Sequence, residues 1–176
     1  MKTKRIYSVT VENRSGVLSN VSGLFARRSF NIDSLAVGET DDPDVSSMTI
    51  VSSGDERTLE QIEKQLNKKL DVIKVKTFEE NQCISRELML MKVKYNKSNR
   101  AEIMEICEVM KADIVDMSMH YMMIQICDTP EKIQLLINMF KSISIVEIAR
   151  TGTLSLSKCV ENDSWRRKQW MIKYFW

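Results

Sequence analysis

The chain has 176 residues, with 26 Lys and Arg side chains against 24 Asp and Glu, one His, four Cys and 43% hydrophobic content. This length allows one ordinary domain or two small ones, and it excludes a barrel enzyme or a dinucleotide-binding enzyme with its own substrate domain. The formal net charge of +2 gives no general drive toward nucleic acid or a membrane surface. The charge is uneven, because residues 158–176 hold five basic and two acidic side chains.

The composition also argues against several kinds of site. No apolar run approaches the roughly 20 residues that span a bilayer, and no signal-peptide core follows Met1, so we expect a cytoplasmic protein. The four cysteines are far apart and include no Cys-x-x-Cys pair, while His120 stands between two apolar runs, where a turn is expected. These residues cannot assemble a metal site, a disulfide framework or a usual catalytic constellation.

The first 78 residues predict four strands and two helices. Residues 5–12 alternate as a half-buried strand, and from Val17 the apolar residues follow the stripe of an amphipathic helix. Two further strands, 32–37 and 45–51, flank the polar loop 40–44. Asp55 is the expected cap of a second helix, after which residues 70–78 form a fourth strand. The predicted order is β-α-β-β-α-β.

The same order recurs about 80 residues later. A strand over 86–95 precedes a helix that begins at Asn99, with Glu102 in a capping-box arrangement. A hairpin over 114–119 and 122–127 follows. Thr129 is the expected cap of a last helix, and residues 144–149 form the last strand. The sequence therefore predicts an α+β fold of two tandem ferredoxin-like sandwiches, each with two helices on one face of an antiparallel sheet. The predicted divisions are domains 1–79 and 86–157, a linker 80–85 and a tail 158–176. Most of the 12 methionines are expected to fill the second core.

Two interpretations of the tail stay open. Its cations and aromatic residues, among them all three Trp, would suit docking on a partner or a membrane surface. The tail is also compatible with a disordered or accidental extension, and we favour this second interpretation.

The turn after the first strand is the one segment that resembles a site. Asn13, Ser15 and Gly16 precede a helix whose free N–H groups and positive dipole end favour a carboxylate. The amide of Asn13 can accept from an ammonium group and donate to a carboxylate, as a zwitterionic amino acid requires. The alternative is that Asn13 and Ser15 only cap the helix and Gly16 only eases the turn. The third strand, 46–51, offers no aromatic platform for RNA.

Longer blocks of the sequence are more specific than this turn. The first half contains the blocks Asn13–Leu18, Gly23–Arg28, Phe30–Leu35, Asp41–Pro43, Met48–Ile50 and Leu59–Leu66. The second half contains the blocks Arg86–Leu90, Ile114–Asp116 and Glu147–Gly152. In order and spacing, over residues 4 to about 157, these blocks resemble the small regulatory subunits of acetolactate synthase (acetohydroxyacid synthase).

The resemblance implies that the first domain is an ACT domain and that the chain has no catalysis of its own. It implies a homodimer through ACT domains and a catalytic large subunit as partner, which this chain activates and makes sensitive to valine or another branched-chain amino acid. Thiamine diphosphate, Mg²⁺ and FAD would belong to that large subunit, and no cofactor to this chain. The implied effector-binding residues are Asn13, Ser15, Gly16, Val17 and Leu18 from the turn and Asn31 from the second strand, with no metal ligand. The turn alone leaves open a free-standing ACT-type amino-acid regulator.

Overall fold

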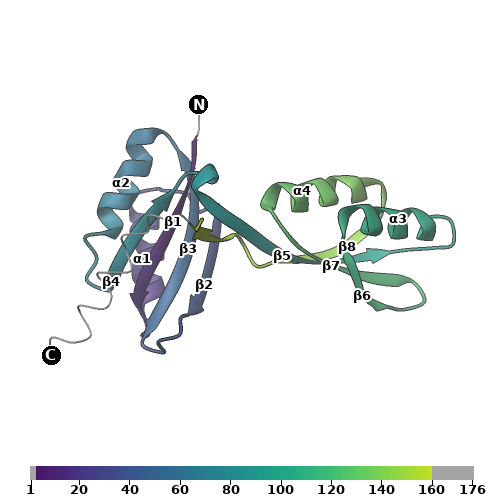
Figure 1. The fold of residues 1–176 in the computed structure, drawn as a ribbon, viewed down its shortest axis with the longest axis horizontal. Coiled ribbons are helices and arrows are strands. Elements are labelled where there is room, and N and C mark those ends of the chain that lie inside the picture. The colour runs from purple at the N-terminus through teal and green to yellow at the C-terminus, as the bar shows by residue number, and fades with distance from the viewer. Residues whose placement is uncertain (1–2, 160–176) are drawn as a thin grey trace.

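The computed structural model describes residues 3–159, which form two sheets joined by one long strand (Figure 1). The first half contains β1 (Thr3–Glu12), α1 (Val17–Arg27), β2 (Ser34–Glu39), β3 (Val45–Gly54), α2 (Glu56–Leu66) and β4 (Val72–Phe78). Its four strands pair antiparallel in the order β2-β3-β1-β4, so β2 and β4 are the edges. The predicted β-α-β-β-α-β order is confirmed, although β2 and β4 each begin two residues later than predicted.

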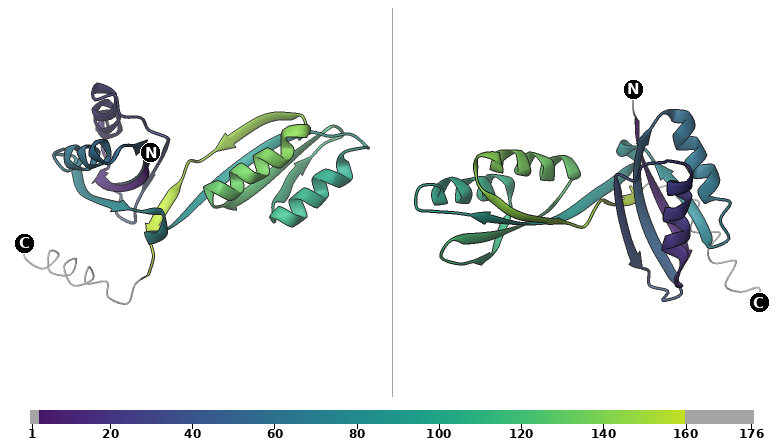
Figure 2. Two further views of the ribbon diagram at one scale, coloured as in Figure 1. Left: turned by 90° about the horizontal axis from the view of Figure 1, so that it is seen from above. Right: turned by 180° about the vertical axis from the view of Figure 1, so that it is seen from behind.

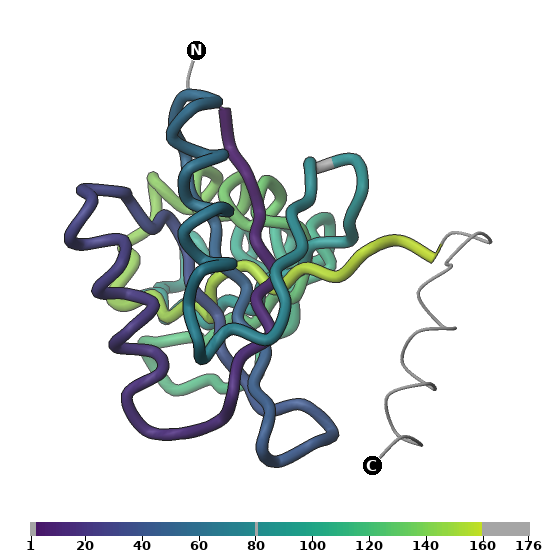
Figure 3. The backbone as a smooth tube through the Cα atoms, turned by 90° about the vertical axis from the view of Figure 1, so that its left-hand side faces the viewer, coloured from purple at the N-terminus to yellow at the C-terminus, as the bar shows by residue number. Residues whose placement is uncertain are grey.

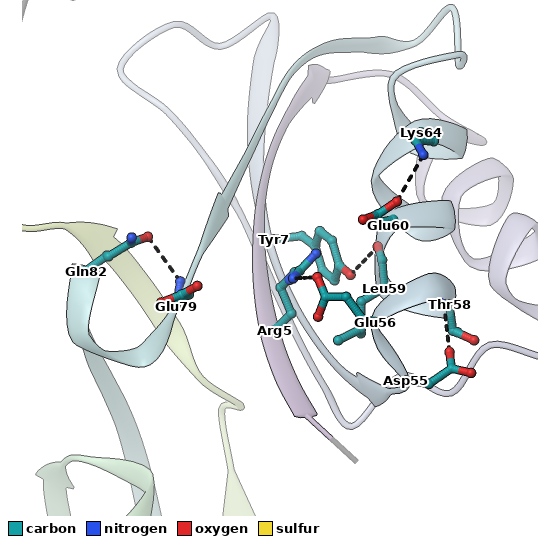
Figure 4. Close-up of polar contacts among 10 residues, drawn as sticks. All are labelled: Arg5, Tyr7, Asp55, Glu56, Thr58, Leu59, Glu60, Lys64, Glu79 and Gln82. Atoms are coloured by element: carbon teal, nitrogen blue, oxygen red, sulfur yellow. Dashed lines mark hydrogen bonds and ion pairs between the residues drawn. The ribbon is translucent and has the colours of Figure 1, made fainter. Parts of the chain in front are cut away.

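Alternation along β1 builds the first core. Tyr7, Val9 and Val11 are fully buried on the face that carries α1 and α2. The hydroxyl of Tyr7 donates to the carbonyl oxygen of Leu59 on α2 at 2.9 Å, and burial raises the pKa of that phenol (Figure 4). Close by, Arg5 of β1 forms an ion pair with Glu56, which fastens α2 to the sheet a second time.

The second half repeats the first. It contains β5 (Cys83–Lys94), α3 (Arg100–Met110), β6 (Asp113–Met117), β7 (Tyr121–Asp128), α4 (Pro130–Met139) and β8 (Ile145–Arg150), with short 3-10 turns at Glu80–Gln82 and Phe140–Ser142. The strand order β6-β7-β5-β8 is that of the first sheet, position for position. A separate core of fourteen buried residues lies between this sheet and α3 and α4.

The junction between the halves differs from the prediction. Residues 83–85, predicted as linker, already belong to β5, because they pair with a ninth strand, β9 (Leu154–Ser157). The sequence predicts no strand at residues 154–157, because four residues alternate too briefly to indicate one and their partners in β5 lie about 70 residues earlier. The boundaries of the two predicted domains stay a prediction.

The β5–β9 ribbon packs on the face of the first sheet that α1 and α2 leave open. Ile6 of β1 is paired with both Val51 and Phe78, and with Cys83 of β5 these residues form a small third core. Figures 1 and 3 show α1 and α2 on the far side of the first sheet from the second half, and Figure 2 shows the ribbon crossing between the halves. The β5–β9 ribbon thus lies at the back of the first sheet, and the second half extends from it (Figures 1 and 2).

Two of the predicted helix caps are confirmed and one is wrong. Asp55 accepts from the backbone N–H of Thr58 at 2.7 Å, and Thr129 accepts from that of Lys132 at 3.4 Å. Asn99 makes no capping bond to α3. Its Oδ1 instead accepts from the backbone N–H of Asn96, because the two asparagines close the preceding turn on each other.

The methionines lie only partly where the sequence predicts them. Met89, Met91, Met110 and Met122 are buried in the second core, but Met104, Met117 and Met119 are about half exposed or more, so the methionines divide between core and surface.

Within residues 3–159 no helix is both long and apolar enough to cross a membrane. The cytoplasmic location stays a prediction, and the tail beyond Cys159 lies outside the described residues.

Candidate functional site

The turn from β1 to α1 is held to the neighbouring β2–β3 loop by Asn13. The backbone N–H of Asn13 donates to the carbonyl oxygen of Asp44 at 2.7 Å. The side-chain amide donates to the carbonyl oxygen of Pro43 at 2.8 Å and to the carboxylate of Glu39 at 3.2 Å. Both amide hydrogens are therefore used within the chain, and the Oδ1 of Asn13 accepts no hydrogen bond from residues 3–159.

α1 begins at an open N-terminus. Gly16 is its N-cap residue, with a φ of +90° in the left-handed region, and among the described residues no side chain caps the helix. The alternative that Asn13 and Ser15 merely cap α1 is therefore wrong. A Cβ added at Gly16 would meet nothing within 4 Å, so glycine is required here by the backbone conformation and not by a close neighbour. The N–H of Val17 donates to the carbonyl oxygen of Arg14 at 3.4 Å. The next two N–H groups of α1, those of Leu18 and Ser19, have no partner among the described residues and lie at the positive end of the helix dipole.

An ionic network fixes the turn on the side of β4. Arg14 pairs with Asp71 at 2.8 Å and with Glu12 at 2.5 Å, and the amide of Asn20 donates to Asp71 at 3.0 Å. The hydrogen bonds from Asn20 and Arg14 hold the pKa of Asp71 below its usual value. The Arg14 guanidinium is thus committed within the chain, and the network joins the turn, the second turn of α1 and the start of β4.

The other predicted residues of the turn lie in different environments. Ser15 is exposed and makes no hydrogen bond through its side chain within the described range. Val17 is only 3% exposed and packs in the first core, so its side chain does not face the surface. Leu18 is 44% exposed on the outer side of the helix. Of these two apolar side chains, that of Leu18 is the one exposed to a ligand or a second chain.

Asn31 lies away from the turn in the same chain. It precedes β2 by three residues, its amide donates to Asp33 at 2.5 Å, and its carbonyl oxygen accepts from the hydroxyl of Ser52 at 2.6 Å. The pairing of β2 with β3 places Asn31 at the Ser52 end of the sheet and the turn at the opposite end. The six residues of β2 span about 20 Å, so one chain does not bring these predicted site residues together.

Glu39 belongs to the candidate site although sequence reasoning missed it. Its carboxylate is exposed and lies against the amide of Asn13, where it adds negative charge beside a vacant acceptor oxygen. No local motif marks Glu39, because only the hairpin of β2 and β3 carries it to the turn. The arrangement offers N–H donors for a carboxylate at α1 and acceptors for an ammonium group at Asn13 and Glu39.

The described residues contain no group of three or more His, Cys, Asp or Glu side chains arranged to hold a metal ion. Cys83 and Cys107 are buried thiols, and burial raises the pKa of Cys107 to about 11. Cys127 and Cys159 are exposed.

Comparisons with known proteins agree for both halves. A family model described as the AHAS small subunit-like ACT domain matches residues 7–74, and one described as the small subunit of acetolactate synthase matches residues 86–159. The acetolactate synthase small subunit of Mycolicibacterium smegmatis is 46% identical over 151 residues, which cover 86% of this chain and 89% of that protein.

Two further relatives extend the match to another sequence and to a solved structure. The small subunit of acetolactate synthase isozyme 3 from Escherichia coli is 41% identical over 88% of this chain and 96% of its own length. The crystal structure of the acetolactate synthase small subunit from Thermotoga maritima superposes with a TM-score of 0.84 and 35% identity, over 90% of this chain and 99% of that one. The first sandwich is accordingly an ACT domain, and the chain belongs to the family of acetolactate synthase small subunits.

Proposed function

We propose that this chain is the non-catalytic regulatory subunit of an acetolactate synthase, which it activates and makes sensitive to a branched-chain amino acid. The single observation that supports this most is the uncapped N-terminus of α1 behind Gly16, in a chain of this family. A helix that has no capping side chain leaves N–H donors and a positive dipole end for a ligand carboxylate.

The effector site is completed by a second copy of the chain. Asn13 and Asn31 lie at opposite ends of β2 in one chain, and β2 is an edge strand whose last three residues are exposed. Two copies related by a two-fold axis and paired through β2 would run antiparallel, which brings the turn of each chain to the Asn31 end of the other. Such a dimer forms two equivalent sites, each with Leu18 and Ser15 beside it.

The effector is an α-amino acid with an apolar side chain. Its carboxylate would accept from the N–H groups at the start of α1, and its ammonium would donate to Asn13 and Glu39. Apolar contact is available from Leu18, which is 44% exposed. A small apolar cavity separates side chains that differ by one methylene by only about 1–3 kcal/mol, so the site accepts branched-chain amino acids as a class, and the family resemblance is the reason that we name valine first.

The catalytic chemistry belongs to the partner. We infer that thiamine diphosphate, Mg²⁺ and FAD are held by the large subunit, and that this chain acts by binding that subunit. Effector binding then shifts the complex toward whichever arrangement binds the effector more tightly.

The test is copurification with the cognate large subunit followed by a valine titration. We expect the chain alone to form no acetolactate, the mixture to be more active than the large subunit alone, and valine to inhibit only the mixture. A free-standing amino-acid regulator would instead bind valine without forming the complex. Unchanged activity and unchanged valine sensitivity on mixing would rule the proposal out.

The site assignment is tested by Asn13→Ala and Asn31→Ala. Each removes hydrogen bonds worth about 1–1.5 kcal/mol, so the half-inhibitory valine concentration should rise about tenfold while activation survives. Asn138→Ala, at an exposed position of α4, is the control and should behave as wild type. Normal valine inhibition in both site variants would remove the assignment.

A further inference from the structure

The segment that follows β8 touches the first half of the chain at the start of β2. The backbone N–H of Thr153, a buried residue, donates to the hydroxyl oxygen of Ser34 at 2.7 Å. Gly152 packs so closely that a Cβ there would stand 2.8 Å from the same hydroxyl oxygen and 3.1 Å from the carbonyl oxygen of Leu35. The φ of Gly152 is +81°, so both its conformation and its surroundings call for glycine.

The same segment is anchored rigidly to the second half. Thr151 exchanges two hydrogen bonds with Leu88 of β5, its N–H donating at 3.0 Å and its hydroxyl oxygen accepting at 3.1 Å. One residue earlier, Arg150 forms a two-pronged ion pair with Glu87, at 2.6 and 2.9 Å. Glu87 is 4% exposed, and such a fork of hydrogen bonds fixes the geometry as well as the charge. A displacement of the segment therefore carries β5 and β8 with it.

On the first half, the contact point is part of the stretch that holds Asn31. Ser34 is the first residue of β2, three residues after Asn31. The residues between them are tied to β3, since the N–H of Asp33 donates to Val51 at 2.8 Å and the hydroxyl of Ser52 donates to the carbonyl oxygen of Asn31 at 2.6 Å. The stretch 31–34 is short and bonded at both ends, so a ligand that displaces Asn31 also displaces Ser34.

We propose that the contact of Ser34 with Gly152 and Thr153 couples the effector site to the second half of the chain. The inference rests on the proposed function, because it takes Asn31 as an effector-binding residue. Effector binding repositions the start of β2, and the buried hydrogen bond and the close packing at Gly152 pass that change to β5 and β8. Ser34 and Gly152 are thus positioning residues that contact no effector themselves.

Two variants break the contact in different ways. Ser34→Ala removes the acceptor and leaves the buried N–H of Thr153 unpaired, with little change in volume. Gly152→Ala inserts a methyl group where the neighbouring atoms leave no room and where φ is positive. Gly23→Ala is the matched control, because a Cβ at Gly23, inside α1, meets nothing within 4 Å.

The readouts use the full chain, alone and in complex with its large subunit. For Ser34→Ala and Gly152→Ala we expect valine to bind the chain alone, in calorimetry, within about threefold of wild type. Activation of the large subunit should also survive. The half-inhibitory valine concentration of the complex should rise at least fivefold, the lower end of typical coupling between sites. Gly23→Ala should match wild type in all three measurements.

Hydrogen exchange tests the coupling without the large subunit. In the wild-type chain, saturating valine should change the exchange of amides in residues 145–157, and Ser34→Ala should abolish this change while valine still binds. Wild-type inhibition in both variants, or valine binding that leaves residues 145–157 of the wild type unaffected, would overturn the inference. A wild-type chain that neither binds valine nor confers inhibition would instead refute the proposed function itself.

Discussion

At the scale of single residues, Asp71 holds the β1–α1 turn from outside the turn. Asp71 directly precedes β4, and it accepts from Asn20 at 3.0 Å and from Arg14 at 2.8 Å. These bonds favour the ionised carboxyl and lower its pKa from the usual 3.8. A group whose pKa is lowered by folding stabilises the folded state above its unfolded pKa, and this contribution is lost as the pH falls through the folded value.

Asp71→Asn should therefore destabilise the chain in a pH-dependent way. The neutral amide accepts a weaker hydrogen bond from Arg14, so the variant should unfold at a lower urea concentration than wild type at pH 7. The gap should stay constant down to about pH 5 and narrow as the pH falls below 3.8, because the unfolded wild-type chain takes up a proton at Asp71 at a higher pH than the folded chain does.

The control is Asp113→Asn, at an exposed position of β6. Its unfolding midpoint should match wild type at every pH. A gap for Asp71→Asn that is as wide at pH 2 as at pH 7 would show that the side chain acts through its shape and not through its charge.

At the scale of the elements, local patterns predicted what local contacts determine. The alternation of β1, the stripe of α1 and the caps Asp55 and Thr129 all appear in the structure, because each depends on residues within a few positions of one another. β9 and the first residues of β5 were missed, since each is a strand only through the other. The hydrogen bonds of Asn13 to Pro43 and Glu39 could not be predicted either, because the partners are distant in sequence and meet only in the folded chain.

The predicted residues of the candidate site also divide into those that local sequence determines and those that depend on distant segments. Gly16 before an apolar stripe predicts where α1 begins, but the sequence leaves open whether Asn13 or Ser15 caps it, and in the structure no side chain does. Val17 and Leu18 are both predicted effector-binding residues, and helix geometry turns adjacent residues about 100° apart, so the side chain of Val17 is buried and that of Leu18 is exposed. The meeting of Asn13 with Asn31 depends on a second copy and stays a prediction.

The two helix starts can be compared by experiment. Thr129→Ala removes the side-chain cap of α4 and should cost about 1 kcal/mol of unfolding free energy. Ser15→Ala, before the uncapped α1, should cost nothing measurable in the absence of effector, because Ser15 makes no capping bond. Both values come from urea unfolding of the full chain at pH 7. An equal loss in the two variants would mean that Ser15 does cap α1 in solution.

At the scale of the whole molecule, the two halves have separate cores and share one strand. No member of the first core, around Tyr7 and Leu59, belongs to the second, around Met91 and Leu136. Within residues 3–159 the contacts between the halves include β5, β9, the small cluster around Ile6 and the contact of Ser34 with Gly152 and Thr153. Such a molecule can lose one core while the other remains, as separate cooperative units do.

Leucine-to-alanine variants of the two cores test this independence. Leu59 and Leu136 are fully buried, so each substitution should cost about 2–5 kcal/mol in the half that contains it. In Leu59→Ala, amides of β1 and β3 should exchange at least about 30-fold faster, while those of β7 keep their wild-type rates. Leu136→Ala should show the reverse pattern.

Exposed leucines in the same halves provide the controls. Leu70 is 97% exposed and Leu135 is 52% exposed, so their replacement by alanine should change exchange little in either half. Faster exchange in both halves for either core variant would mean that β5 and the junction make the chain one cooperative unit. In that case the junction would transmit stability as well as the proposed effector signal, and the predicted division into domains 1–79 and 86–157 would not describe how the chain unfolds.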